Sequence, residues 1–195
     1  MKKRSEDRRI QKTRKALHEA LISLMMQKKY EWIAVQEILD RANVGRSTFY
    51  LHYRDKDELL LDGMNYLWQT LQQAQSAAAG SIRKHEVVIA FSLAWFQHTF
   101  EHRNIFKLIV GSHAWDIVRP RMEEMLFQLI QDPARPRYKK KLSPDGSFEL
   151  FVHFVGTAFL SVVTWWLNQK NPVPPEQIDS HFRQLILPIL DAHLS

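Results

Sequence analysis

The stretch NVGRSTFYLHYRDKDELL, residues 43–60, gathers guanidinium, hydroxyl, phenol and imidazole groups within a few helical turns. The groups in question belong to Arg46, Ser47, Thr48, Tyr50 and His52. Arginine and hydroxyl groups suit guanine edges, thymine methyls and phosphate oxygens, and the phenol and imidazole can donate to a phosphate backbone. A solvated helix face would carry Glu and Lys instead. The stretch therefore predicts a surface that contacts nucleic acid.

Two short helices must position these groups. Apolar residues of the first, over 35–42, recur at i, i+3, i+4 and i+7, and a turn at Asn43–Val44 leads to a second helix over 46–52. Phe49 and Tyr53 fall on the face of the second helix that would pack on the first. The pattern predicts a helix-turn-helix, whose second helix can enter a major groove.

Lys56 lies at the start of the next helix. Asp55 and Glu58 form a D-x-x-E capping box that begins this helix, so Lys56 occupies its first turn. A cation there opposes the helix dipole, whereas a bound phosphate would reverse the penalty. Lys56 is therefore either a phosphate contact or a surface lysine tolerated by solvent.

The net charge of +6 is placed unevenly. Residues 1–60 hold 14 Lys and Arg against 9 Asp and Glu, and residues 1–15 alone hold 8 against 2. This asymmetry is either the footprint of a polyanion or a solubilising tail. An RNA-binding adaptor is a further alternative, but the sequence predicts no sheet with stacking aromatics.

Composition excludes several other classes. There is no cysteine, which fits a reducing cytosol and rules out thiolate metal sites and nucleophiles. We find no apolar signal region at the N-terminus, and no apolar run is expected to reach the length of a bilayer span. The sequence thus predicts a cytoplasmic protein without membrane insertion.

Helical periodicity continues along the chain, and no segment alternates with period two. We predict an all-α fold of about nine helices, with a DNA-binding domain over 1–60 and a second helical domain over 61–195. The expected helices beyond residue 55 cover 56–79, 84–101, 103–111, 115–131, 147–169 and 175–193. A Pro-rich basic segment, 132–147, is predicted to be a solvated loop.

One motif favours a different class of protein. His98, Glu101 and His102 match H-x-x-E-H, in which two histidines on one helix face hold Zn²⁺ and the glutamate acts as base. No third ligand is evident, and the same residues suit a helix end. We therefore expect no catalytic residues, no metal and no cofactor.

The segment VQEILDRANVGRSTFYLHYRDKDELL, 35–60, resembles the DNA-binding domain of the TetR family of bacterial transcriptional regulators. The resemblance implies Arg46, Ser47 and Thr48 near bases, and Tyr50, His52 and Lys56 on phosphates. It also implies a homodimer on a palindromic operator, a ligand-binding C-terminal domain and usually repression. This chain departs from the family pattern at three positions in particular. Ala34 replaces a hydroxyl N-cap and leaves Glu37 without its capping partner, and Asn43 replaces a turn glycine but tolerates a left-handed backbone. Gly45 replaces a usual serine at the start of the recognition helix, where glycine is an acceptable cap.

The C-terminal region supplies two further predictions. A small apolar or cationic effector is expected in an aromatic-lined pocket, although a filled core is the alternative. The predicted pocket residues are Trp68, Trp95, His98, His113, Trp115, Thr157 and Trp165. The helices over 147–169 and 175–193 are expected to form the dimer interface. The predicted interface residues are Gly156, Leu160, Thr164, Ile178, Phe182, Leu185, Ile186 and Ile189.

Overall fold

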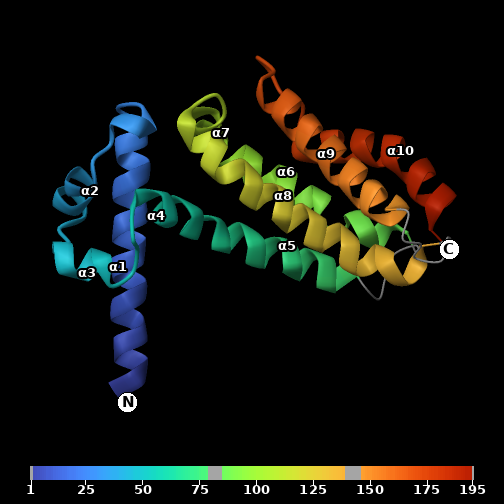
Figure 1. The fold of residues 1–195 in the computed structure, drawn as a ribbon. Coiled ribbons are helices and arrows are strands. Elements are labelled where there is room, and N and C mark those ends of the chain that lie inside the picture. Colours follow the sequence, from blue (N-terminus) through green and yellow to red (C-terminus); the bar gives the residue numbers. More distant parts are fainter. Residues whose placement is uncertain (1, 79–84, 139–145, 195) are drawn as a thin grey trace. The chain divides into compact units, whose positions relative to one another are not determined.

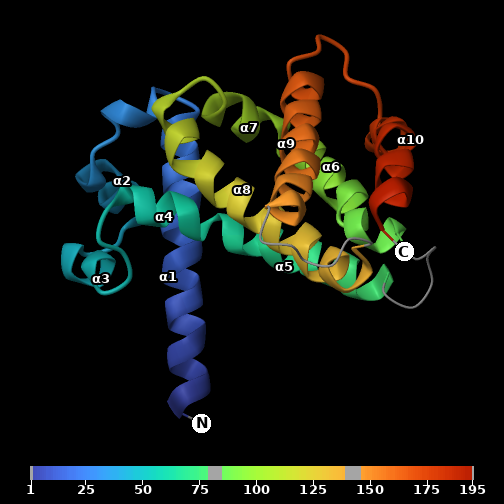
Figure 2. The ribbon, with the colours of Figure 1, turned by 45° about the vertical axis from the view of Figure 1, so that its right-hand side comes forward.

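The computed structural model describes residues 2–78, 85–138 and 146–194. In these ranges the chain forms ten α-helices and three 3-10 helices, and the sole β-type pairing is an isolated bridge between Tyr138 and Leu194 (Figures 1 and 2). The predicted all-α class is confirmed. The chain divides into two compact units: unit 1 comprises the residues up to Asn65 together with Leu108–Val118, and unit 2 comprises Tyr66–Lys107 and Arg119–Ser195.

Unit 1 is built on the long helix α1. Its elements are α1 (Lys2–Met25), η1 (Tyr30–Trp32), α2 (Val35–Ala42), α3 (Arg46–Tyr50) and α4 (Lys56–Asp62). The apolar face of α1 begins at Leu17, and its buried side chains pack in a core with Ile38 of α2, Phe49 of α3 and Leu59 of α4. The helix-turn-helix is thereby held against the C-terminal part of α1.

The turn between α2 and α3 has the backbone that its sequence predicts. Asn43 ends α2 in the left-handed region, with φ 50° and ψ 47°. Asparagine adopts this conformation more readily than most side chains, which confirms the expectation for this position. The amide of Val44 donates to the carbonyl of Leu39 at 3.1 Å and closes the end of α2.

The helix expected over 56–79 is two helices, α4 and α5 (Met64–Ala78), which meet at Gly63. A Cβ at Gly63 would lie 3.2 Å from His18 Cε1 and 3.2 Å from the carbonyl oxygen of Leu60. The glycine is therefore needed for close approach to α1. This break accounts for the tenth helix.

Unit 2 has an aromatic core. Its elements are η2 (Glu86–Ile89), α6 (Ser92–Glu101), α7 (Arg103–Ile109), α8 (His113–Ala134), η3 (Arg135–Arg137), α9 (Ser147–Leu167) and α10 (Pro175–His193), with α5. The units share α7 and α8, whose residues 108–118 belong to unit 1. In the core, the ring of Phe159 contacts those of Trp95, Phe96 and Phe182 at centroid distances of 5.1–5.4 Å. Such edge-on aromatic contacts fill space densely and hold α6, α9 and α10 together.

A buried ionic cluster reinforces the contact between α6 and α10. Asp179 accepts hydrogen bonds from the Ser92 hydroxyl and, at 2.7 Å, from Arg183 Nε. Arg183 also donates to the carbonyl of Ile89 at 3.3 Å and lies 3.8 Å from Glu86. Because both charges are paired and hydrogen-bonded, burial of Asp179 is tolerated.

Helix α9 is long and apolar, and it ends at Leu167, two residues before the end of the helix expected over 147–169. By length and composition it is sufficient to cross a membrane, so the expectation that no apolar run reaches that length was wrong. Half of its most apolar stretch is buried inside the protein, and the core helix of a soluble protein meets the same criterion. Gly156 lies on this buried side, where a Cβ would come within 3.1 Å of the Phe127 ring. The glycine thus permits close packing of α8 on α9.

Candidate nucleic-acid interface

The recognition helix α3 separates packing groups from exposed polar groups. Phe49 and Tyr53 are buried, with ring centroids 5.7 Å apart, and they anchor α3 within unit 1. Arg46, Ser47 and Tyr50 are exposed on the other side. The local sequence produces this split because Phe49 and Tyr53 are one helical turn apart.

The exposed groups form one surface. The Arg46 guanidinium lies 5.8 Å from the centroid of the Tyr50 ring, so the two side chains share a face. Thr48 and His52 are half-buried at the edges of that face. Leu51, which the sequence analysis did not single out, is 81% exposed at the end of the helix. The face offers a cation, hydroxyls, a phenol and an apolar group, the mixture that base edges and phosphates require.

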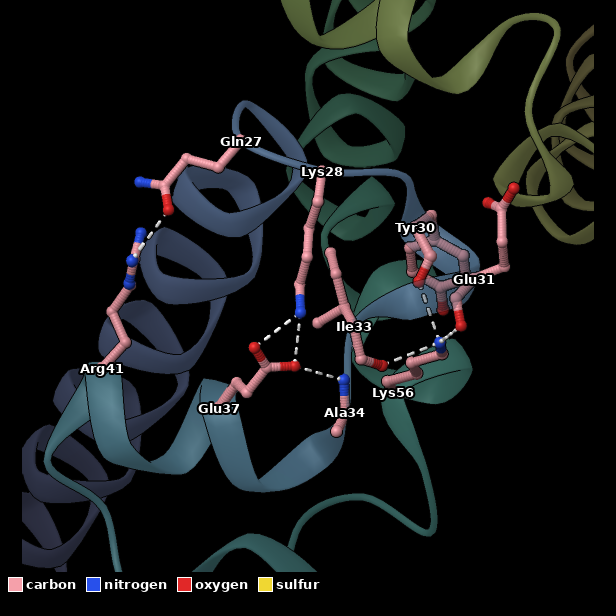
Figure 3. A network of polar contacts seen from close by, with 9 residues as sticks. All are labelled: Gln27, Lys28, Tyr30, Glu31, Ile33, Ala34, Glu37, Arg41 and Lys56. Carbon is pink, nitrogen blue, oxygen red and sulfur yellow. Dashed lines mark hydrogen bonds and ion pairs between the residues drawn. The ribbon is translucent and has the colours of Figure 1, made fainter.

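A salt bridge and hydrogen bonds fasten both ends of α2 to the segment that follows α1 (Figure 3). Glu37 accepts from the backbone amide of Ala34 at 2.9 Å, and both its oxygens bind Lys28 Nζ, at 2.5 and 2.6 Å. These bonds hold the pKa of Glu37 below its usual value, the Lys28 bond most strongly. Arg41, at the other end of α2, donates to Gln27 at 3.0 Å. As expected, Ala34 supplies no side-chain cap to α2, but Glu37 still forms its own half of the box with the Ala34 amide.

Lys56 is engaged by the protein itself (Figure 3). Its ammonium donates to the carbonyls of Tyr30 and Ile33, each at 2.9 Å, and to that of Glu31 at 3.3 Å. The same ammonium lies 4.6 Å from the centroid of the Tyr30 ring. Since an ammonium has three donors, a phosphate contact would have to displace a carbonyl. Lys56 thus fastens η1 onto α4 in this structure, and its phosphate contact stays a prediction.

The start of α4 has half of its predicted capping box. The Asp55 carboxylate accepts from the amide of Glu58 at 2.8 Å. The Glu58 carboxylate, however, accepts from the amide of Arg54 at 2.7 Å, one residue earlier than a capping box requires. The hydrogen bonds from Arg54 lower the pKa of Glu58.

Asp62 joins α4 to α1 through three partners that sequence reasoning missed. It accepts from the Tyr53 hydroxyl at 2.6 Å and lies 3.2 Å from His18 Nε2 and 3.9 Å from the Arg14 guanidinium. Burial raises the pKa of Asp62, but these bonds and charges outweigh burial and leave the pKa below its usual value. His18 and Arg14 are 44 and 48 residues from Asp62 in the sequence, and no local pattern indicates them.

The structure does not bring the predicted pocket residues together. Trp95 is fully buried in the aromatic core, whereas Trp165 is 59% exposed and Thr157 is exposed. His113 and Trp115 belong to unit 1, whereas the other predicted pocket residues belong to unit 2. For Trp95, the filled core weighed in the sequence analysis is therefore correct.

Of this set, Trp68 lines a hollow in unit 2. The hollow is open to solvent, lies between α5 and α8 and has a volume of about 250 Å³. Its lining is Trp68, Gln72, Gln75, Ser76, Gln128, Leu129, Asp132 and Pro133. Its amide and carboxylate groups make it more polar than the pocket that the sequence predicted.

Most of the predicted dimer residues face inward. Ile178, Phe182 and Ile186 are 3–4% exposed and line the core of unit 2, because they recur one turn apart on the inner face of α10. Gly156 and Leu160 are also buried, and the Thr164 hydroxyl donates to the carbonyl of Leu160. For the five buried residues, assignment to an outward interface was wrong, whereas for the half-buried Thr164 it stays a prediction.

Other apolar side chains occupy the outer faces of α9 and α10. Leu185, which was predicted at the interface, is 71% exposed, and Ile189 is half-buried. On α9, Leu150 is 68% exposed and Phe154 is 50% exposed. The sequence had not singled out Leu150 or Phe154 for this face.

The rings of His98 and His102 are in contact, with centroids 4.5 Å apart and planes tilted by 56°. Burial, together with the neighbouring His102, lowers the pKa of His98 to about 4. Within the described residues, no three His, Asp or Glu side chains come close enough to hold a metal ion. The three-ligand site that the H-x-x-E-H alternative requires is therefore not formed there.

Comparison with known proteins gives the same picture as the geometry. The family model "Bacterial regulatory proteins, tetR family" matches residues 17–62, and the model "Transcriptional regulator C-terminal region" matches residues 89–188. The HTH-type transcriptional regulator YxbF of Bacillus subtilis is 26% identical over 194 residues, which are 95% of this chain and 47% of that protein. The chain spans about half the length of the curated relatives it matches.

Solved structures share the fold. A TetR transcriptional regulator from Streptococcus agalactiae is 26% identical with a TM-score of 0.63, covering 93% of this chain and 97% of that chain. A TetR-family regulator from Syntrophomonas wolfei is 15% identical with a TM-score of 0.73, covering 92% of this chain and 95% of that chain. One family model matches the helix-turn-helix and another matches about half of the chain, which confirms the resemblance seen in the sequence. The chain belongs to the TetR family of bacterial transcriptional regulators.

Proposed function

We propose that this regulator is a homodimeric, cytoplasmic repressor that binds a palindromic operator and is released from it by a small effector. The observation that carries the proposal is the split of α3 into a buried anchor, Phe49, and an exposed face with Arg46, Ser47 and Tyr50. A short helix fixed in this way can be presented to a major groove with its side chains intact.

The face of α3 supports separate roles for its residues. Arg46, Ser47 and Thr48 lie in the first turn, and we assign them to base edges, with Arg46 suited to guanine. Tyr50 and His52 lie one turn later and are assigned to phosphates. Lys56 is left out of the phosphate set because its donors bind carbonyls.

Dimerisation is assigned to the outer faces of α9 and α10. Leu150, Phe154, Trp165 and Leu185 are each at least 50% exposed, and large apolar side chains gathered on two adjacent helices favour a partner surface. A two-fold axis would pair each face with its copy and present two α3 helices to two half-sites. The palindromic operator follows from that symmetry.

The hollow between α5 and α8 is the candidate effector site. Its volume of about 250 Å³ suits a small molecule, and Trp68 offers an aromatic wall beside the Asp132 carboxylate. This lining favours a small cationic effector over a purely apolar one. Release from DNA would require the effector to bind more tightly to a conformation with wrongly spaced recognition helices.

The proposal is tested by selecting bound sites from random duplex DNA at a fixed salt concentration. We expect an enriched palindrome, and in a reporter strain, lower transcription from a promoter that contains it. Enrichment of no sequence would overturn the assignment of operator binding. Raised transcription would overturn repression, and a monomer at micromolar concentration in sedimentation would overturn the dimer.

A further inference from the structure

We propose that the N-terminal half of α1 is a second DNA-binding surface, which holds phosphates flanking the operator without reading their sequence. The surface is the basic ridge of Arg9, Lys12 and Lys15, continued by the basic residues that precede it in the sequence. This inference rests on the proposed operator binding by α3.

The N-terminal half of α1 does not contribute to the core of unit 1. From residue 9 onward, the first buried side chain is Leu17, and the buried residues that follow line one face as far as Met25. At 1.5 Å per residue, the helix before residue 13 extends for roughly 15 Å. Figures 1 and 2 both show α1 continuing past α3 toward the N-terminus. Packing within unit 1 therefore gives no reason for this extension.

Among the side chains that the structure describes, from residue 9 onward, little neutralises the charges on the ridge. Arg9, Lys12 and Lys15 are exposed, and the sole ion pair described for them joins Lys15 to Glu19 at 3.8 Å on an open surface. Such exposed pairs contribute little. Arg14, by contrast, lies 3.9 Å from Asp62 and 5.9 Å from the centroid of the Tyr53 ring, and it belongs to the core side. The helix thus has one structural cation and a separate basic ridge.

The helix end itself favours an anion. Its first turn contains no acidic residue, and its sequence there is Lys2, Lys3 and Arg4. Cations at a helix N-terminus oppose the dipole, and a helix segment without an apolar face gains little stability in water. A polyanion would offset both costs.

Duplex DNA is the polyanion that the geometry favours. Because α1 and α3 belong to the same compact unit, one duplex can meet both helices, and the inference is that a duplex seated on α3 also passes the extended end of α1. Arg9 and Lys15 are six residues apart, about 9 Å along the helix, which spans two or three phosphates of one strand. The ridge would add affinity and salt dependence without adding base preference.

The test compares two triple variants of the full-length protein with the same change in net charge. The ridge variant carries Arg9→Gln, Lys12→Gln and Lys15→Gln. The control carries Lys107→Gln, Arg119→Gln and Lys170→Gln, which are exposed positions, and Arg119 has an i,i+4 partner as Lys15 does. The affinity is measured by fluorescence anisotropy between low and moderate NaCl. Three duplex probes are used. The first is the selected operator without flanking sequence, the second is the same operator extended by about one helical turn on each side, and the third is a random duplex.

On the extended operator, the slope of log K against log salt should be less steep for the ridge variant than for the wild-type protein. The expected difference is up to ~2.7 per bound protomer, because each lost phosphate contact reduces the magnitude of the slope by about 0.9. The control slope should stay at the wild-type value, and the ratio of operator to random affinity should be preserved in both. An unchanged ridge slope, or an equal fall in both variants, would overturn the inference and leave a solubilising segment. Failure of the wild-type protein to bind any duplex would instead overturn the proposed function.

Discussion

Lys56 at the start of α4 can serve to bind backbone carbonyls of its own chain or to bind a DNA phosphate. Substitution of Lys56 by Met distinguishes these two roles. The methionine keeps the length and apolar stem of the side chain and removes the ammonium. Its loss leaves the carbonyls of Tyr30, Glu31 and Ile33 without their shared donor, and it removes a cation 4.6 Å from the Tyr30 ring centroid. Both losses act on the segment that joins α1 to α2.

The magnitude follows from these contacts. A hydrogen bond from a charged donor contributes about 1.5–3 kcal/mol, and an exposed cation–π contact about 0.5–1 kcal/mol. Lys56 is half-buried, so water can replace part of its bonding to the three carbonyls. We therefore expect Lys56→Met to lower the free energy of unfolding by ~2–3 kcal/mol, well below the sum of the separate bonds.

Urea unfolding followed by circular dichroism gives the free energy, and hydrogen exchange locates the loss in η1, α2 and α4. Lys29→Met is the matched control, because it removes the same charge from an exposed neighbour that lies over the Trp32 ring at 5.6 Å. The salt slope of operator binding, corrected for the folded fraction, should equal that of the control variant. Unchanged stability with a slope lower by ~0.9 per protomer would refute this reasoning and restore the phosphate contact.

Three other predictions concern α3, α10 and α6. Arg46→Ala should relax specificity at one operator position per half-site by ~1–3 kcal/mol; an unchanged selection profile would remove Arg46 from the base-reading set. Phe182→Ala should lower the free energy of unfolding by ~3–5 kcal/mol because the ring fills the core. Leu185→Glu should raise the dimer dissociation constant measured by sedimentation, with little effect on the free energy of unfolding. A Phe182→Ala variant that is stable but monomeric would reverse the roles assigned to the two residues. Since the pKa of His98 is lowered to about 4, the unfolded chain binds more protons below pH ~6.5, and stability is lost as pH falls from there toward 4. After a discount for partial solvent exposure, His98 should lower the free energy of unfolding by ~1 kcal/mol between pH 7.5 and pH 5. Urea unfolding at the two pH values should therefore show a fall in this free energy that is ~1 kcal/mol smaller for His98→Gln than for the wild-type protein.

The helices and the helix-turn-helix could be predicted from the sequence because they depend on neighbours within a few residues. The i, i+3, i+4 and i+7 apolar residues of 35–42 fixed α2, and Phe49 with Tyr53 fixed the inner face of α3. Asn43 indicated the left-handed turn, since few other side chains tolerate that backbone. These features arise from local sterics and periodicity.

The roles of individual polar and apolar side chains depended on partners that are distant in the sequence. Lys56 binds carbonyls more than twenty residues earlier, and Asp62 meets His18 across 44 residues, so neither partner could be found by spacing. Similarly, Phe182 and Leu185 lie on the same apolar helix, and only the packing of α6 and α9 against α10 decided which of them is buried. Sequence alone determined where most of the helices lie and which face of α3 is outward, but not the break at Gly63 or the end of α8 at Ala134. The tertiary structure decided which charges are already neutralised and which apolar face of each helix remains open to a partner, because both depend on what the rest of the chain places against them.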